Sequence, residues 1–232
     1  MDRIFAQIEL RSKAISSHKL FSDIERISVE EVPDKMKVWA PLFIHLTMTF
    51  RDINQMFYIS PEPCDIYQQE INAHARIDST HWHFLLDDLK VVGADDHPKF
   101  FKEHLNLIWS DTGAPIRQYM YALIGRAQSC GDSPFLRATV MESGEATVKL
   151  FFATTRLMAK RFKQATGKTL KYFGDDHLRS EVENPVDKSV FDDVVLDNAT
   201  VQIALNLVDA HFDKFKDFLD AKYAITFGRE PE

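Results

Sequence analysis

The chain has 232 residues, 45% of them apolar, and a formal net charge of −7, which fits an ordinary globular protein with one sizeable core. The negative charge argues against nonspecific nucleic-acid binding, because neutralising phosphates is the main source of that affinity. The longest stretch without a charged residue, VWAPLFIHLTMTF, has 13 residues and is too short to span a bilayer. We therefore expect neither a nucleic-acid partner nor a membrane partner.

The chain has only 8 glycines, and its apolar residues recur at helical spacing over long segments. The expected helices cover residues 2–18, 29–58, 65–92, 97–111, 115–130, 134–166, 170–184 and 192–224. Gly93 and Gly167 follow two of them, at the position where glycine favours a helix end. The pattern predicts an all-α fold, a single domain over residues 1–232 with a bundle of about seven to eight helices.

The two cysteines and the N-terminal sequence indicate a cellular location. Cys64 and Cys130 match no zinc-binding spacing and no CxxC motif. The first residues, MDRIFAQIELRSK, are amphipathic and lack the apolar segment and the cleavage site of a secretory signal. We therefore expect two free thiols and a cytoplasmic protein.

Two stretches, HARIDSTH and HLRSEVEN, share one spacing of potential ligands. They present His74, Asp78 and His81 in the first, and His177, Glu181 and Asn184 in the second. On an α-helix, residues seven apart come within about 20° of the same face, and the acid lies one turn from each. Two such helices packed face to face would direct their nitrogen and oxygen donors at one point.

A further donor is expected from the segment RATVMESGEATVKLFF, where Glu142 has apolar neighbours. A carboxylate on the core side of a helix needs a partner, which a cation could supply. Imidazoles combined with carboxylates favour non-heme iron. The two motifs and Glu142 together offer the donors of one metal site. The same spacing also occurs on solvated helix faces, and this alternative stays open for each motif taken alone.

The segment EINAHARIDSTHWHFLLDDLKVVG resembles the helix that carries the first ligands in the heme-oxygenase-like superfamily, in particular in its non-heme di-iron oxidases and oxygenases. Pyrroloquinoline-quinone synthase and the thiaminase-II family resemble these enzymes in architecture. The order of AISSHKLF, a ligand helix, a central helix with a glutamate and a second motif before a long last helix is similar too. The resemblance implies a heme-oxygenase-like bundle with non-heme iron, one or two ions, that activates dioxygen on a small organic substrate. Carried over by position, the metal ligands that it implies are His74, His81, Glu142, His177 and Glu181, followed at lower rank by Asp78, Asn184 and Glu70.

Two positions depart from the family pattern, and they leave the number of metal ions open. His74 stands where the di-iron members have glutamate, and Asn184 where they have histidine. Asp78 or Glu70 could restore the missing carboxylate. Heme is not expected, because the only candidate for a proximal ligand is His18, in a context that equally fits a helix end.

The expected substrate pocket contains aromatic residues beside the first motif and histidines on apolar stripes of the long helices. These residues are Trp82, Phe84, His45 and His211. A lone histidine on such a stripe is more often a hydrogen-bonded core residue, so both interpretations stay open for the two histidines. The alternative function is a non-catalytic protein of the same fold with a degenerate metal site, which binds a small hydrophobic ligand or a partner. A homodimer is compatible with the sequence.

Overall fold

A computed structural model describes residues 1–94, 98–183 and 186–228, and in these ranges the chain forms helices and no strand. The predicted all-α class is therefore confirmed. The elements are α1 (Asp2–Ile15), α2 (Lys19–Ile24), α3 (Val32–Trp39), the 3₁₀ helix η1 (Ala40–Leu42), α4 (Phe43–Ile53), the π-helix η2 (Asn54–Tyr58), α5 (Ile66–Asp78), α6 (Trp82–Val92), α7 (Pro98–Trp109), α8 (Ala114–Ser129), α9 (Pro134–Thr166), α10 (Asp175–Glu183), the 3₁₀ helix η3 (Lys188–Phe191) and α11 (Asn198–Phe227).

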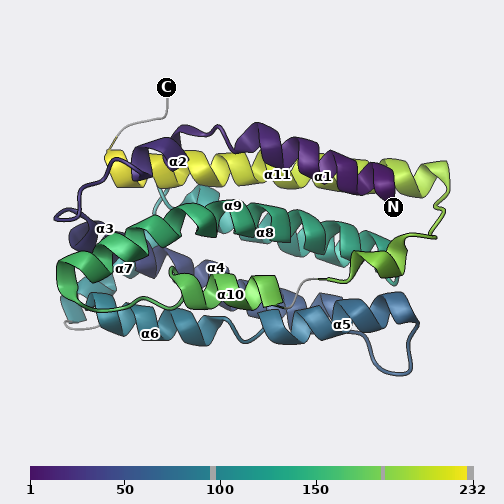
Figure 1. Cartoon of the computed structure of the whole chain (residues 1–232), viewed down its shortest axis with the longest axis horizontal. Coiled ribbons are helices and arrows are strands. Elements are labelled where there is room, and N and C mark those ends of the chain that lie inside the picture. Colours follow the sequence, from purple (N-terminus) through teal and green to yellow (C-terminus); the bar gives the residue numbers. More distant parts are fainter. Residues whose placement is uncertain (95–97, 184–185, 229–232) are drawn as a thin grey trace.

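The long helix α9 is the centre of the bundle. It packs against α1, α2 and α11 on one side and against α5 and α10 on the other, and Figure 1 shows these two groups flanking it. Its first residue is a proline, and the Ser133 side chain caps its N-terminus by accepting a hydrogen bond from the Leu136 N–H. Gly167, with a φ of 72°, ends it as predicted. With 33 residues, α9 is about 50 Å long, so it contributes side chains along the whole bundle.

The core is rich in phenylalanine and joins α4, α9 and α11. The Phe43 ring centroid lies 5.4 Å from that of Phe151 and 5.1 Å from that of Phe173, with the second pair edge to face. Phe151 in turn lies 5.7 Å from Phe218 of α11. Such tilted and edge-to-face pairs are favourable arrangements of aromatic rings, and they tie the three helices together next to the cavity described below.

The structure divides one expected helix, residues 29–58, into several shorter elements. The break begins around Pro41, which lacks the N–H that an uninterrupted helix would use, and the chain forms η1 there before it resumes as α4. The segment then ends in the π-helix η2. The elements of this segment are all helical, so the prediction of helix holds, but the prediction of one continuous helix does not.

The two cysteines, Cys64 and Cys130, are both free, as predicted. Gly93 ends α6 with a φ of 73°, which also agrees with the prediction.

None of the helices in the described ranges combines the length and the apolar character that a bilayer crossing requires.

Candidate metal centre

The first motif lies at the end of α5 and in the turn that follows it. Asp65 caps α5 by accepting a hydrogen bond from the Gln68 N–H, which fixes where the helix begins. His74, Asp78 and His81 are 4%, 4% and 5% exposed. A solvated helix face is therefore the wrong interpretation of this motif, and the three side chains need partners inside the protein.

The turn between α5 and α6 interrupts the expected helix over residues 65–92. The Ser79 hydroxyl donates to the Arg76 carbonyl at 2.8 Å and the Thr80 hydroxyl to the Ile77 carbonyl at 2.7 Å. Serine and threonine that bond back to the preceding turn compete with the regular helical bonds, and the backbone tightens here. His81 consequently becomes the N-terminal cap residue of α6, directly after the end of α5.

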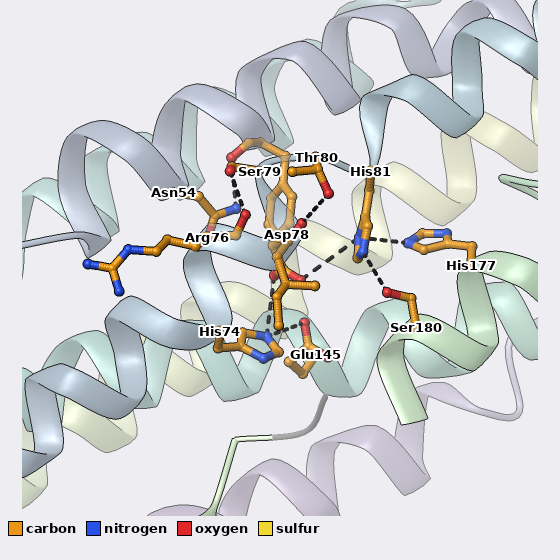
Figure 2. Close-up of polar contacts among 12 residues, drawn as sticks. Asn54, His74, Arg76, Asp78, Ser79, Thr80, His81, Glu145, His177 and Ser180 are labelled. Carbon is orange, nitrogen blue, oxygen red and sulfur yellow. Dashed lines mark hydrogen bonds and ion pairs between the residues drawn. The ribbon is translucent and has the colours of Figure 1, made fainter. Parts of the chain in front are cut away.

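His74, Asp78 and Glu145 form a buried group in which the imidazole lies between two carboxylates (Figure 2). His74 Nε2 is 3.3 Å from Asp78 Oδ2 and 3.4 Å from Glu145 Oε1. One ligand-type atom from each residue lies within 4.8 Å of the other two. This group could therefore hold a metal ion.

His81 and His177 extend this group on the other side of Asp78. His81 Nδ1 lies 3.9 Å from Asp78 Oδ1 and 3.2 Å from His177 Nε2, while its Nε2 is 3.1 Å from Ser180 Oγ (Figure 2). The two oxygens of Asp78 thus face different histidines. The structure brings together the two motifs, although His81 and His177 are 96 residues apart in sequence. We refer to His74, Asp78, His81, Glu145 and His177 as the acid–imidazole cluster.

The orientation of His177 is set by the backbone. Its Nδ1 is 3.1 Å from the Tyr172 carbonyl oxygen, which can only accept, so this nitrogen carries the hydrogen. The Nε2 lone pair is then directed at the cluster. Histidines that ligate metals usually donate their other N–H in this way, and the contact fixes both the tautomer and the ring. The Tyr172 ring also stacks on His177, with 4.8 Å between centroids.

The loop before α10 is held by Asp88 of α6, and this contact positions Tyr172. The Asp88 carboxylate accepts from the Lys171 N–H at 2.5 Å and from the Phe173 N–H at 3.1 Å. The helix expected from residue 170 therefore starts only at Asp175. The backbone N–H groups of the loop are bonded to a side chain instead of to a preceding helical turn.

The electrostatics of the cluster favour a positive charge between the carboxylates. Burial by itself lowers the pKa of His74, but hydrogen bonds and charge from Asp78 and Glu145 outweigh it and raise this pKa to about 11. Without a metal, the protonated His74 offsets part of the negative charge of the two acids. A divalent ion at the same place would replace that proton.

Four members of the cluster, Asp78, His81, Glu145 and His177, form the polar end of a cavity with a volume of about 60 Å³. Apart from the cluster, the wall is almost entirely apolar. Its phenylalanines are Phe43, Phe50, Phe151, Phe152, Phe215 and Phe218. A pocket of this kind, apolar with a few convergent polar groups, is typical of a small-molecule site.

Glu142, the glutamate predicted as a ligand, lies outside the cluster. Its Oε2 pairs with Lys188 Nζ at 2.6 Å and faces a surface groove between α1 and α9. The glutamate of α9 that reaches His74 is Glu145, three residues later. Glu145 borders both the inner cavity and this groove, where Lys149 Nζ lies 3.9 Å from its Oε2.

A periodic signal for Glu145 was present in the sequence. Met141, Glu145, Val148 and Phe152 are spaced by four, three and four residues, which places Glu145 in an apolar stripe of α9. The stripe that contains Glu142 continues with Ala146 and Lys149, toward the groove.

Of the remaining predicted ligands, only Glu70 has a described side chain, and it lies outside the cluster. Glu70 accepts a hydrogen bond from the Asp187 N–H at 2.8 Å and thus holds the chain before η3. Asn184 lies outside the described residues, and so does the side chain of Glu181. Both nitrogens of His18 have protein partners, since Nδ1 accepts from the Leu20 N–H and Nε2 lies 3.0 Å from Asp220 Oδ1.

The four predicted pocket residues are not among those that line the cavity. Trp82 stacks on the imidazole of the next residue, and Phe84 stacks on His81, behind the cluster. His45 packs between two aromatic rings of α7 and α8. His211 is fully buried and contacts two hydroxyls of the cavity wall. Sequence periodicity identified these residues as core-facing, but it did not distinguish a cavity wall from the packing behind it.

The donor set of the cluster fits a metal ion. Three imidazoles and two carboxylates converge in a buried site, and Asp78 Oδ1 has no hydrogen-bond partner among the described residues. A buried carboxylate oxygen in that position is costly unless a cation lies nearby. No protein-family model matches the sequence, and no curated protein matches it.

Proposed function

We propose that the protein is a non-heme iron-dependent oxidoreductase that activates dioxygen on a small organic substrate bound in the cavity. The observation that carries this proposal is the acid–imidazole cluster at the polar end of an apolar cavity. Membership in the heme-oxygenase-like superfamily, which the sequence resembles, is part of the proposal, and the all-α class is compatible with it.

His74, Asp78 and Glu145 would hold the iron, and His81 and His177 would contribute from the other side of Asp78. Iron held by imidazoles and carboxylates, with a coordination position left open, supplies dioxygen activation. The two oxygens of Asp78 face the two halves of the cluster, so this residue can serve one ion or be shared by two.

The chain itself prepares the site before any ligand binds. The Tyr172 carbonyl keeps the Nε2 lone pair of His177 directed at the cluster, and Asp88 holds the loop that carries Tyr172. The phenylalanine wall keeps water away from the reacting atoms, which limits side reactions of an activated oxygen species. The substrate would bind against this wall with its reacting carbon toward the cluster.

Anaerobic titration with ferrous ion tests the proposal, with two glutamates of α9 as a matched pair. Glu145→Gln should lower the iron affinity at least about 10-fold, because even changes next to a ligand cost about 10- to 100-fold. Glu142→Gln is the control, since Glu142 is as buried as Glu145 but pairs with Lys188. Equal affinities in the two variants, or no iron binding by the unmodified chain, would contradict the assignment. The iron-loaded protein should then consume dioxygen faster than Glu145→Gln.

A non-catalytic protein with a degenerate metal site is the second candidate, and one observation favours it. His74 with its proton already supplies a positive charge between Asp78 and Glu145, so the cluster contains a cation without a metal. Metal content after purification from iron-supplemented medium separates the two candidates. A chain that retains no iron and consumes no dioxygen would support the second one.

A further inference from the structure

A second polar group lies on the cavity wall, apart from the acid–imidazole cluster. Tyr119 of α8 and Thr147 of α9 both line the cavity, and both hydroxyls contact His211 of α11. The distances from His211 Nε2 are 3.4 Å to Tyr119 Oη and 3.2 Å to Thr147 Oγ1. The imidazole itself is fully buried, so it can act on the cavity only through these two hydroxyls.

The helical geometry of α9 separates this group from the cluster. At about 100° per residue, Thr147 and Glu145 lie about 160° apart around the helix axis, with Val148 and Gly144 between them. All four residues line the cavity. Glu145 and Thr147 therefore lie at the two edges of the face that α9 presents to it, and a ligand can contact both polar groups at once.

Gly144 keeps the space between the two polar groups open. Glycine is among the least favourable residues inside a helix, yet Gly144 lies well within α9 and is buried. A Cβ atom built there would meet no heavy atom within 4 Å, so a side chain would extend into the cavity. The cavity volume of about 60 Å³ would hold roughly four to six water molecules, which is about the bulk of one small ring.

The charges on the wall restrict the ligand. Among the described residues that line the cavity, none is a lysine or an arginine, and the only carboxylates are Asp78 and Glu145 of the cluster. Burial, together with the nearby charge of Arg126, lowers the pKa of His211 well below its usual value, so this imidazole is neutral. An anionic ligand would find no opposite charge at this end of the cavity, whereas an uncharged group does not need one.

The hydrogen-bonding pattern favours an oxygen that accepts. The Thr147 hydroxyl already donates to the Gly144 carbonyl at 2.8 Å. The contact between Tyr119 Oη and His211 is long for a hydrogen bond, so the phenol can turn its hydrogen toward a ligand. We propose that Tyr119, Thr147 and His211 form a recognition subsite for an uncharged hydroxyl or carbonyl oxygen on a small apolar ring. This inference rests on the proposed function only in identifying the ligand as the substrate, whose other end would lie at the cluster.

Binding of benzyl alcohol, toluene and benzoate to the metal-free chain tests the subsite, because the three probes differ only in the polar group. Benzyl alcohol should bind about 3- to 10-fold more tightly than toluene, the range expected for one net hydrogen bond. Benzoate should bind more weakly than either. Tyr119→Phe should remove the preference for the alcohol and leave toluene binding unchanged. Tyr121→Phe, which changes an exposed phenol of the same helix, is the control and should keep the preference.

A pair of glycine variants tests whether the ligand occupies the cavity. Gly144→Leu should fill it and abolish binding of all three probes. Gly125→Leu places the same side chain at an exposed helical glycine that also has open space, and it should bind like the unmodified chain. Circular dichroism of both variants checks that the helices are intact. Equal affinities for benzyl alcohol and toluene, or no binding of any probe, would overturn the inference. Since no metal is present, a failure of iron binding would instead count against the proposed function.

Discussion

The acid–imidazole cluster and Lys222 are both buried against the same aromatic core, but their surroundings differ. In the acid–imidazole cluster, each charged side chain has a nitrogen or oxygen of opposite character within about 4 Å. Lys222 of α11 is also fully buried, but its Nζ faces only rings, 4.1 Å from the Trp39 centroid and 4.4 Å from the Phe43 centroid. No hydrogen-bond partner of this amine lies in the described part of the chain.

The difference determines which charges exist in the folded protein. Aromatic faces attract a cation by roughly 0.5–2 kcal/mol, less than the cost of taking an ammonium group out of water. Burial therefore lowers the pKa of Lys222 well below its usual value, while acidic partners raise the pKa of His74. Phe43 borders both places, the cavity on one side and the lysine on the other. Of these two side chains, the one that keeps a positive charge is the one with carboxylate oxygens beside it. A metal ion needs the same kind of surroundings.

The largest effect is expected for Asp78→Ala. Asp78 faces both His74 and His81, so its removal should lower the affinity for ferrous ion at least about 100-fold. Anaerobic titration measures this change. Asp52→Ala, at an exposed aspartate of α4, should keep the affinity of the unmodified chain. A loss of less than about 10-fold would mean that Asp78 is not a ligand.

The next largest effect, an increase in stability, is expected for Lys222→Met. Methionine fills a similar volume without an amine that lacks hydrogen bonds, so the free energy of unfolding at pH 7 should rise by about 1–3 kcal/mol. The unfolded chain keeps the lysine proton up to about pH 10, whereas the folded protein gives it up. The stability of the unmodified protein should therefore increase between pH 7 and 10, and the advantage of the variant should shrink.

Urea unfolding of both proteins at several pH values measures this trend. Lys216→Met changes an exposed lysine of the same helix and should alter the stability by no more than about 0.5 kcal/mol. If Lys222→Met destabilised the protein instead, the contacts with Trp39 and Phe43 would outweigh the burial of the amine.

The smallest effect concerns Asp88, a buried acid whose partners are backbone N–H groups. Burial raises the pKa of Asp88 to about 7, and the N–H groups of Lys171, Tyr172 and Phe173 oppose this only in part. Between about pH 4 and 7 the folded protein thus keeps a proton that the unfolded chain releases, and this group makes stability fall as the pH rises. Asp88→Asn should remove that slope, so its stability relative to the unmodified chain should improve from pH 5 to pH 8.

Asp87→Asn is the matched control for this experiment. Hydrogen bonding to Lys171 lowers the pKa of the neighbouring Asp87, so its stabilising contribution is lost only at pH values below about 4. Its pH dependence between 5 and 8 should follow that of the unmodified chain. Parallel curves for Asp88→Asn and the unmodified chain would show that Asp88 does not titrate in this range.

Local signals were sufficient for much of the fold. Ser133 and Pro134 mark the start of α9 and Gly167 marks its end, each next to the helix end that it signals, and the structure has the helix there. The spacing of His74 and His81 likewise depends on geometry within one segment. The turn at Ser79 was not foreseen, because serine occurs in intact helices and the sequence does not show which way its hydroxyl points.

The choice between the two glutamates of α9 could not be made in the same way. Both are almost fully buried, so burial does not distinguish them. What separates them is Lys188, which follows 46 residues after Glu142 and reaches it only because η3 packs near α1 and α9. Which residues line the cavity also depends on packing between segments that are far apart in sequence. The sequence does not show this packing, so it predicts Trp82 and His45 on the wall, although neither lines the cavity.

Glu145 gives the cluster an unusually thin boundary. Its carboxylate borders the inner cavity and also the surface groove between α1 and α9, so a single side chain separates bulk solvent from His74 at this point. Rotation of a side chain takes far less time than local unfolding of a helix. Loading and loss of an ion should accordingly be fast on the laboratory timescale, and a small chelator should strip the protein within minutes without denaturant. The metal content of a preparation would then depend on whether its purification buffers contain a chelator.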